Sequence, residues 1–297
     1  MKVLMITGDK RFGPGHPRYD LQKSAVEALD VLYWGRGALW PALPQGSFDV
    51  VSAQDPLWRG LFGLYAARRL RATLNVQVHM DLDVLSGGRQ ALARFILRRA
   101  HSVRVVSEKI KEQVGTLGVK APITVLPVFV ELEKFRSIVR EPHEGKNVLW
   151  IGRFEPEKDP LMAVEVLKQV RAQGIDARLI FLGSGALEPQ LRHAAEGLPV
   201  SFPGWQSPLP HLAVADVVVS TSRHESWGES IVEALAAGVP VVAPDVGVAA
   251  EAGAAVVPRA ALSDAVAQTL ILGTRGTLRL ELLEAQAWAK RFRESFT

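Results

Sequence analysis

Short apolar runs rich in valine, isoleucine and leucine alternate with amphipathic segments along almost the whole chain. Runs of this kind, bounded by glycine, proline or polar residues, predict buried strands, and the segments between them have the spacing of helices. In the first half, strands are predicted at residues 2–7, 30–34, 48–52, 73–78, 103–107 and 123–130. Helices are predicted between them at residues 19–28, 56–71, 90–100 and 110–117.

The alternation stops at a polar stretch, residues 136–146, whose proline and glycine are typical of a linker. It then restarts, and the next strands are predicted at residues 147–152, 177–182, 200–202, 217–222, 240–244 and 254–257. Helices are predicted at residues 160–173, 187–195, 208–215, 262–272 and 278–296, and one more is predicted to begin near Ser226. Because strands that alternate with helices form parallel sheets, this pattern predicts an α/β fold with two doubly wound, Rossmann-like domains.

The length of 297 residues, of which 48% are hydrophobic, is enough for two domains with full cores. We expect residues 1–135 to form the first domain, 147–280 the second, and 281–297 a helix that packs back on the first. No apolar run reaches the roughly 18 residues of a membrane-spanning helix, and M-K-V-L-M-I-T-G-D is charged too early for a signal peptide. The chain has no cysteine, which excludes disulfides and thiolate metal sites, so a cytoplasmic protein is expected.

Positive charge is concentrated in the first domain. Residues 1–135 carry 19 lysines and arginines against 12 acidic residues. The basic residues come in patches: Arg68, Arg69, Arg71, Arg94, Arg98, Arg99, Arg104, Lys109 and Lys111. Such patches are commonest as solvated helix faces, but they would also suit an anionic membrane surface, with the protein peripheral at its inner face, or an anionic acceptor. No binding motif for nucleic acid accompanies the charge, so nucleic acid is not expected as a partner.

Residues 223–238, R-H-E-S-W-G-E-S-I-V-E-A-L-A-A-G, join a predicted strand to a predicted helix and hold the carboxylates of Glu225 and Glu233. If the helix begins near Ser226, a rise of about 1.5 Å per residue places these carboxylates roughly 10–12 Å apart. That separation suits two hydroxyl-bearing ends of one extended ligand, and the N–H groups at the helix start favour an anion between them. A nucleotide sugar has this layout. The alternative is a capping box of Ser226 with Glu229, and a solvated Glu233.

A second candidate is the loop I-G-R-F-E-P-E-K-D, residues 151–159, which leaves the first strand of the second domain. Arg153 offers a bidentate fork and Lys158 a mobile point charge, and together they suit a diphosphate. The alternative is that both make surface ion pairs with the acidic residues of the same loop, Glu155, Glu157 and Asp159.

Four weaker signals lie at other predicted strand ends. His79 ends a strand and could act as a general acid or base, as a hydrogen-bond partner for a hydroxyl, or as a structural histidine. The turn L-G-S-G at residues 182–185 could approach a phosphate, although many such turns exist for geometry alone. Trp205 follows a short strand and could stack on a nucleobase or cover the core. The loop at residues 8–16 has glycines but is interrupted by Pro14, which lacks an N–H.

Taken together and in this order, the segments V-L-W-I-G-R-F-E-P-E-K-D, L-I-F-L-G-S-G and R-H-E-S-W-G-E-S-I-V-E-A-L-A-A-G-V-P-V-V-A resemble the family 4 retaining glycosyltransferases. The resemblance is strongest over residues 147–257 and covers most of the chain. It implies the GT-B fold, in which two Rossmann-like domains face each other across a cleft. The sequence departs from the family pattern at Trp227, where phenylalanine is usual, and at residues 245–247, where Asp-Val-Gly replaces a glycine pair.

The resemblance also implies roles for single residues. Arg153 and Lys158 would hold the donor diphosphate, Glu225 would contact the transferred sugar, and Glu233 would hold the ribose hydroxyls. His79 matches the acceptor-side histidine of the family. The remaining residues implied to lie around the donor are Gly13, Gly15, Gly183, Gly185, Trp205, Gln206, Trp227, Gly228, Glu229 and Ser230.

The function that these features predict is a retaining transfer of a hexose from a UDP- or GDP-sugar to a hydroxyl of a glycan or lipid-linked acceptor, as in polysaccharide biosynthesis. No metal ion is expected, because two cations on one loop could stabilise the leaving diphosphate. One alternative is another nucleotide-sugar enzyme of the same fold, such as a 2-epimerase or a sugar phosphorylase. The other is a non-catalytic nucleotide-binding protein.

Overall fold

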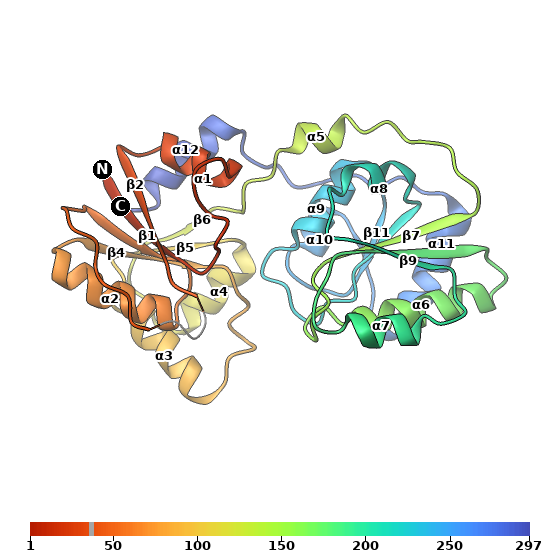
Figure 1. The fold of residues 1–297 in the computed structure, drawn as a ribbon, viewed down its shortest axis with the longest axis horizontal. Helices are drawn as coiled ribbons and strands as arrows, with labels where there is room; N and C mark the ends of the chain where they lie inside the picture. Colours follow the sequence, from red (N-terminus) through yellow and green to blue (C-terminus); the bar gives the residue numbers. More distant parts are fainter. Residues whose placement is uncertain (36–38) are drawn as a thin grey trace. The chain divides into compact units, whose positions relative to one another are not determined.

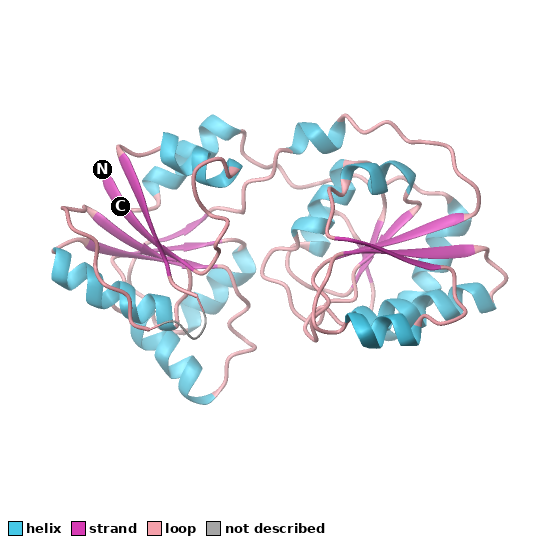
Figure 2. Cartoon of the chain, in the orientation of Figure 1, coloured by secondary structure: helices cyan, strands magenta, loops and turns pink. Residues whose placement is uncertain are grey.

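The computed structural model describes residues 1–35 and 39–297, which form two compact units (Figure 1). The first unit holds Met1–Phe129 and Leu282–Thr297, and the second holds Val130–Glu281. Each contains one six-stranded sheet, and every strand pairing in both sheets is parallel (Figure 2). The fold is therefore α/β with two doubly wound sheets.

The first sheet has the strand order β2-β1-β3-β4-β5-β6. Its strands are β1 (Lys2–Thr7), β2 (Ala28–Tyr33), β3 (Val50–Ala53), β4 (Thr73–Val78), β5 (Ser102–Val105) and β6 (Ile123–Val125). Figure 1 shows helices on both faces of this sheet. On one side lie α2 (Trp58–Leu70), α3 (Gly87–Leu97) and α4 (Glu108–Thr116), and on the other lie α1 (Pro17–Ser24) and α12 (Ala285–Glu294).

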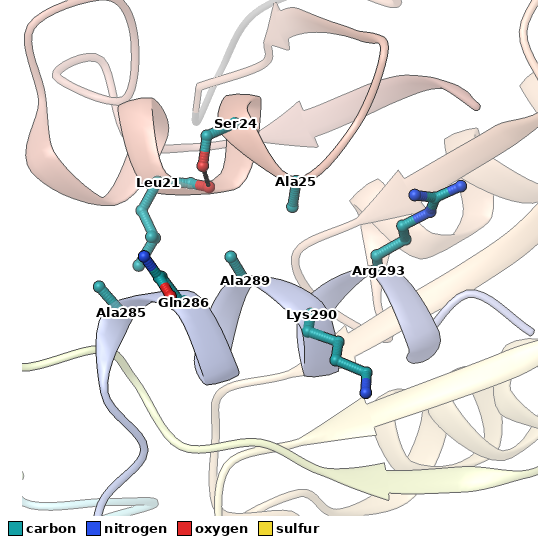
Figure 3. Close-up of a pocket in the computed structure, with 8 residues that line it drawn as sticks. All are labelled: Leu21, Ser24, Ala25, Ala285, Gln286, Ala289, Lys290 and Arg293. Atoms are coloured by element: carbon teal, nitrogen blue, oxygen red, sulfur yellow. Dashed lines mark hydrogen bonds between the residues drawn. The ribbon is translucent and has the colours of Figure 1, made fainter.

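Helix α12 closes the core of the first unit from the far end of the chain. Its buried Trp288 and Phe292 pack with Val3 and Met5 of β1. The Nε1 of Trp288 donates to the carbonyl of Pro127 at 2.9 Å. Where α12 meets α1, facing alanines leave an open surface hollow of about 380 Å³, lined on the α12 side by Ala285, Gln286, Ala289, Lys290 and Arg293 (Figure 3). The first core therefore depends on residues that follow the whole second unit.

The second sheet has the order β12-β11-β10-β7-β8-β9. Its strands are β7 (Lys146–Ile151), β8 (Ala177–Leu182), β9 (Val200–Gly204), β10 (Val217–Val219), β11 (Val241–Ala243) and β12 (Ala255–Val256). Helices α6 (Pro160–Ala172), α7 (Glu188–Ala194) and α11 (Leu262–Leu272) share one buried cluster with the sheet. The others are α5 (Leu132–Arg136), α8 (Leu209–Val214), α9 (Glu229–Ala236), α10 (Ala249–Ala252) and the 3-10 turn η1 (Arg259–Ala261).

Both sheets reverse their winding direction at one pair of neighbouring strands. In the first sheet the chain runs from β1 outward to β2 and then returns to β3, on the other side of β1. In the second it runs from β7 to β8 and β9 and returns to β10, which pairs with β7. Ligands of doubly wound folds bind outside the carboxyl ends of strands at such reversal points. The loops after β1, β3, β7 and β10 are therefore the first places to look for a site.

Several predicted helix boundaries are wrong, including both ends of the helix predicted at residues 90–100, which spans Gly87–Leu97. Three of these errors have a clear physical cause. The helix predicted at residues 19–28 begins at Pro17, where the side chain of His16 caps it, and ends at Ser24 because Ala28 already pairs with Lys2 in the sheet. The last helix begins at Ala285 rather than 278, because the preceding backbone bonds to the second unit, with Arg279 N donating to Ala252 O.

The third error concerns the helix predicted to begin near Ser226. It begins at Glu229, and its N-cap is Gly228 with a left-handed φ of 95°. A glycine adopts this conformation at little cost, and its φ turns the chain into the helix. The N-cap of α9 is therefore Gly228, and the prediction that Ser226 is the capping residue is wrong. Within residues 1–35 and 39–297, no helix combines the length and apolarity needed to cross a membrane.

Candidate active site

The loop after β7 is fixed by the glycine turn after β8. Phe154 is fully buried, and its N–H donates to the carbonyl of Ser184 at 2.9 Å. A Cβ on Gly185 would lie 2.6 Å from Phe154 O, and a Cβ on Gly183 would lie 1.8 Å from Gly152 O. Only glycine fits such close backbone packing. These two glycines, predicted to approach a phosphate, thus pack against the loop that carries Arg153 and Lys158.

Lys158 lies beside Glu225. Its Nζ donates to Glu225 Oε1 in an ion pair between two side chains that are 19% and 14% exposed. Ser222 Oγ donates to the same carboxylate oxygen at 2.9 Å. The loops after β7 and β10, which leave neighbouring strands, therefore bring a cation and a carboxylate together at the reversal point of the second sheet.

A buried threonine ties these two loops together. Thr221, which follows β10, donates from Oγ1 toward the carbonyls of Lys158 and Asp159, at 3.0 and 2.8 Å. The same oxygen accepts the indole N–H of Trp150 on β7 at 2.8 Å. Because these bonds hold the backbone of Lys158, its side chain leaves the loop from a fixed position.

Arg153 is on the same loop but points elsewhere. Its exposed guanidinium donates to Glu157 Oε1 at 2.9 Å. This is the surface ion pair that the sequence offered as the alternative to a diphosphate role. An exposed pair of this kind contributes little to stability, about 0–1 kcal/mol, so Arg153 can exchange Glu157 for a phosphate at small cost.

A network of two arginines around Asp159 was missed by the sequence analysis. Asp159, at a left-handed φ of 46°, accepts from Arg223 at 2.7 Å and pairs with Arg259 through the same oxygen. Arg259 also donates to the carbonyl of Thr221. The R-H-E segment contains Arg223, but nothing in the spacing indicated that Arg259, a hundred residues from Asp159, would lie there. These arginines add positive charge next to Lys158.

The segment from Glu225 to Glu233 runs from the loop into α9. Trp227 is buried, and its indole nitrogen has no hydrogen-bond partner among the described residues. Gly247 packs against this segment, because a Cβ there would lie 2.3 Å from Trp227 O. Glu229, Ser230 and Glu233 are half-buried on α9. Gly247, the last residue of the Asp-Val-Gly segment that departs from the family pattern, thus packs against the turn that holds Glu225.

Trp205 follows β9, and its ring is 57% exposed. Its neighbour Gln206 is also exposed and donates from Nε2 to Pro203 O at 2.8 Å. An exposed indole on a strand-end loop offers a flat face for stacking, and covering the core is not its role.

His79 lies in the first unit, at the end of β4. Its Nε2 is 3.0 Å from Gln77 Oε1, which also accepts from Arg104 Nη1 at 3.1 Å, while Gln77 Nε2 donates to Ser52 Oγ at 2.9 Å. Because Gln77 Oε1 can only accept, this network assigns the proton of His79 to Nε2. Burial and the charges of Arg104 and Arg18 lower the pKa of His79 to about 3. His79 is therefore a neutral hydrogen-bonding group at neutral pH and a poor general base.

The glycine loop after β1 has room around it. Among the residues that the structure describes, no heavy atom lies within 4 Å of a Cβ built on Gly13 or Gly15, and Gly15 has a left-handed φ of 85°. The structure thus places the predicted residues in two groups, each within its own unit. Lys158, Glu225 and the start of α9 are in the second, whereas His79 and the loop of Gly13 and Gly15 are in the first.

The fold and these strand-end loops define a two-sheet α/β protein of the GT-B type, with charged groups at the reversal point of the second sheet. Family models match both units: the glycosyltransferase 4-like domain at residues 11–128, and glycosyl transferases group 1 at residues 145–272. The chain belongs to the group 1, GT4-like glycosyltransferases.

Solved structures support the fold. The chain matches Anabaena HepE, solved with UDP-glucose, at a TM-score of 0.73 and 18% identity, over 99% of this chain and 94% of that one. It matches sucrose-phosphate synthase of Thermosynechococcus elongatus at 0.72 and 18%, over the same shares.

Curated relatives match over shorter segments. A GDP-mannose-dependent alpha-(1-6)-phosphatidylinositol dimannoside mannosyltransferase of Mycobacterium tuberculosis is 31% identical over 44% of this chain and 38% of its own length. An alpha-monoglucosyldiacylglycerol synthase of Streptococcus pneumoniae is 25% identical over 67% of this chain and 52% of its own length. The chain thus spans about half the length of these relatives, or less.

Proposed function

We propose that the protein is a retaining glycosyltransferase that moves a hexose from a UDP- or GDP-sugar to a hydroxyl of a glycan or lipid-linked acceptor. The observation that carries the proposal is the ion pair of Lys158 with Glu225 at the reversal point of the second sheet. The second unit would bind the donor, and the first unit would bind the acceptor.

In this mechanism the donor replaces contacts that the free protein makes within itself. The diphosphate takes Lys158 from Glu225 and Arg153 from Glu157, and Glu225 then accepts hydrogen bonds from hydroxyls of the sugar. Negative charge grows on the leaving diphosphate in the transition state, and a fixed cation there lowers the barrier. Glu233 would accept the ribose hydroxyls, and Trp205 would stack on the base.

Titration of the full chain with UDP and GDP, together with transfer assays on a panel of nucleotide sugars, tests the proposal. Lys158→Ala should weaken diphosphate binding and lower turnover by at least about tenfold, or 1.4 kcal/mol. Lys168→Ala is the matched control, because Lys168 makes an exposed ion pair with Glu165 on α6. Unchanged binding and turnover in the Lys158 variant would refute the proposed donor site.

The first unit has a surface that suits an anionic membrane. Helices α2 and α3 contact each other and expose the aromatic rings of Trp58, Tyr65 and Phe95. The same two helices and the residues that end them expose basic side chains: Arg68, Arg69, Arg94, Arg98 and Arg99. Arg99 lies over the ring of Phe95. Aromatic rings favour the membrane interface, and each cation near an anionic surface contributes about 1 kcal/mol. The two curated relatives are named for a phosphatidylinositol dimannoside and a glucosyldiacylglycerol, which supports a lipid-linked acceptor here.

Co-sedimentation with vesicles tests this surface. The protein should bind mixed phosphatidylglycerol–phosphatidylcholine vesicles at low salt and dissociate from them as the salt concentration rises. It should not bind vesicles of pure phosphatidylcholine. The double variant Arg94→Glu, Arg98→Glu should lose the binding, whereas Lys168→Glu in the second unit should keep it. Equal binding by both variants would exclude α3 as the contact.

A further inference from the structure

The first unit contains a polar hollow of about 180 Å³ at the reversal point of its sheet. The hollow lies at the carboxyl ends of β1, β3 and β4, which contribute Asp9, Gln54 and His79 to its wall. Helix α1 adds Arg18 and Gln22. The aromatic side chains of Phe12, Phe129 and Trp288 form its apolar side. All of these residues belong to the first unit, so the hollow is complete within it.

Arg104 is a buried cation on the wall of this hollow. It lies on β5 and is 2% exposed. The prediction that it belongs to a basic surface patch is therefore wrong. Its protein partners are neutral: the carbonyls of Leu126 and Pro127 and the amide oxygen of Gln77. Within the described residues, no carboxylate forms an ion pair with it. A buried charge without an opposite charge is costly, and proteins normally pair it.

The guanidinium of Arg104 keeps donor capacity for a ligand. The four bonds use Nε, both N–H groups of Nη2 and one N–H group of Nη1, whereas a guanidinium has five. The charge of Arg18 also acts here, since with burial it lowers the pKa of Arg104 to about 9. At neutral pH Arg104 therefore remains charged, and the wall of the hollow carries a buried positive charge. Among its described lining residues Asp9 is the one carboxylate, and it is exposed and accepts the N–H of Arg11 at 3.0 Å.

Gln22 supplies a hydrogen-bond acceptor on the wall of the same hollow. It is 5% exposed, it lines the hollow, and its Oε1 is buried without a hydrogen-bond partner among the described residues. Leaving a buried acceptor unpaired is unfavourable, and a hydroxyl of a ligand that donates to it would remove that cost. The hollow therefore suits a ligand in which anionic oxygens and a hydroxyl donor lie close to one another.

We infer that this hollow binds a phosphorylated polyol, with the phosphate facing Arg104 and Arg18 and a hydroxyl donating to Gln22. The inference rests on the proposed function, because the polyol would be the acceptor or the part of it next to the glycosylated hydroxyl. A phosphate monoester, with about −1.5 to −2 charges at neutral pH, matches two arginines better than a single carboxylate does. The aromatic side chains would cover the apolar carbon face of the polyol.

Calorimetric titration of the full chain tests the inference without any transfer reaction. The probes are myo-inositol 1-phosphate and glycerol 3-phosphate, each paired with its uncharged polyol, and inorganic phosphate as the minimal anion. The phosphorylated probes should bind at least tenfold tighter than the uncharged polyols. Equal affinity within each pair would overturn the inference. Binding of UDP or GDP, measured in the same samples, reports separately on the proposed donor site.

Two variants locate the binding. Gln22→Glu places a carboxylate in the hollow and should weaken the binding of the phosphorylated probes at least tenfold, with UDP or GDP binding unchanged. Gln22→Leu removes the acceptor for the hydroxyl but keeps the arginines. It should therefore weaken the binding of the polyol phosphates and leave the binding of inorganic phosphate unchanged. Tm values close to that of the native protein show that both variants fold. Undiminished polyol phosphate binding by Gln22→Glu would overturn the inference.

Two further readouts complete the test. A bound phosphate should raise the pKa of His79, because it offsets the charges of Arg104 and Arg18, and histidine NMR signals of the full chain report this directly. If Arg104 has only a structural role, the His79 signals should not change when phosphate is added. That result would contradict the site. Phosphatidylinositol vesicles that compete with myo-inositol 1-phosphate would identify a lipid headgroup as the source, whereas a lack of competition would identify a soluble polyol phosphate.

Discussion

The Nζ of Lys158 donates to the carboxylate of Glu225, a residue 67 positions further along the chain. Each of the two belongs to a loop that follows one of the paired strands β7 and β10. The pairing of these two strands is therefore what brings the ions together. The protein satisfies both charges internally, so a ligand that binds either charge has to separate the pair.

A double-mutant cycle on this pair should show strong coupling. Lys158→Ala and Glu225→Ala each leave a largely buried charge without its partner, so each should lower the free energy of unfolding by about 1–3 kcal/mol. The double variant should lose less than the sum, with a coupling energy of about 0.5–3 kcal/mol in urea unfolding. Additive losses would mean that the two side chains do not interact in solution.

Replacing His79 should make the protein less sensitive to acid. The pKa of His79 is about 3 in the folded protein and about 6.5 when unfolded, so between these values the unfolded chain binds more protons. Stability from this group is thus fully present above about pH 6.5 and is lost as the pH falls toward 3. Between pH 7.5 and 4.5, His79→Gln should lose about 2–3 kcal/mol less than the native protein in urea unfolding.

The control for this experiment is His193→Gln, because His193 is on an exposed part of α7. It should retain the acid sensitivity of the native protein. If the two variants lose stability equally on acidification, burial of His79 is not the cause.

Trp205→Ala should weaken nucleotide binding without lowering stability. The ring is more than half exposed, so its loss removes little core packing, whereas loss of base stacking costs about 1–3 kcal/mol. Calorimetry with UDP and GDP measures the effect, and Trp58→Ala on α2 is the matched exposed tryptophan. A Kd equal to that of the native protein would remove Trp205 from the site.

Gly185→Ala should damage the active-site loop through packing. The added methyl group would meet Phe154 O at 2.6 Å and Phe154 N at 2.7 Å, so the loop carrying Lys158 has to shift. Overpacking of this kind costs about 1–3 kcal/mol, and diphosphate binding should weaken with it. Gly115→Ala in α4 meets no heavy atom of the described residues within 4 Å and should be neutral or stabilising by up to about 1 kcal/mol. A native Tm for Gly185→Ala would contradict the close packing.

The sequence predicts most of the fold because its strands are continuous apolar runs. Lys2–Thr7, Thr73–Val78 and Ala177–Leu182 have the predicted bounds, since both faces of a parallel sheet are buried and the runs stop at polar residues. Helix starts were harder to predict. A left-handed glycine at Gly228 moved the beginning of α9 to Glu229, and local patterns do not indicate that conformation.

The loop that carries Arg153 and Lys158 follows β7 as predicted, because its residues are close together in the sequence, while their binding roles stay a prediction. The candidate site was not predictable where distant residues meet. Arg104 sits in a run of valines and was assigned to a basic surface, although a cation in such a run has to be buried with the strand. Its partners, 22 to 27 residues away, appear only when the strands are ordered side by side.

The return of α12 to the first sheet sets an order of events during synthesis. The Asn75 side chain in the middle of that sheet donates to the carbonyl of Ser295, and the rings of Trp288 and Phe292 pack beneath β1. None of these partners exists until the second unit has left the ribosome. The second unit can thus mature first, and the one translated earlier stays unfinished until residues 282–297 emerge.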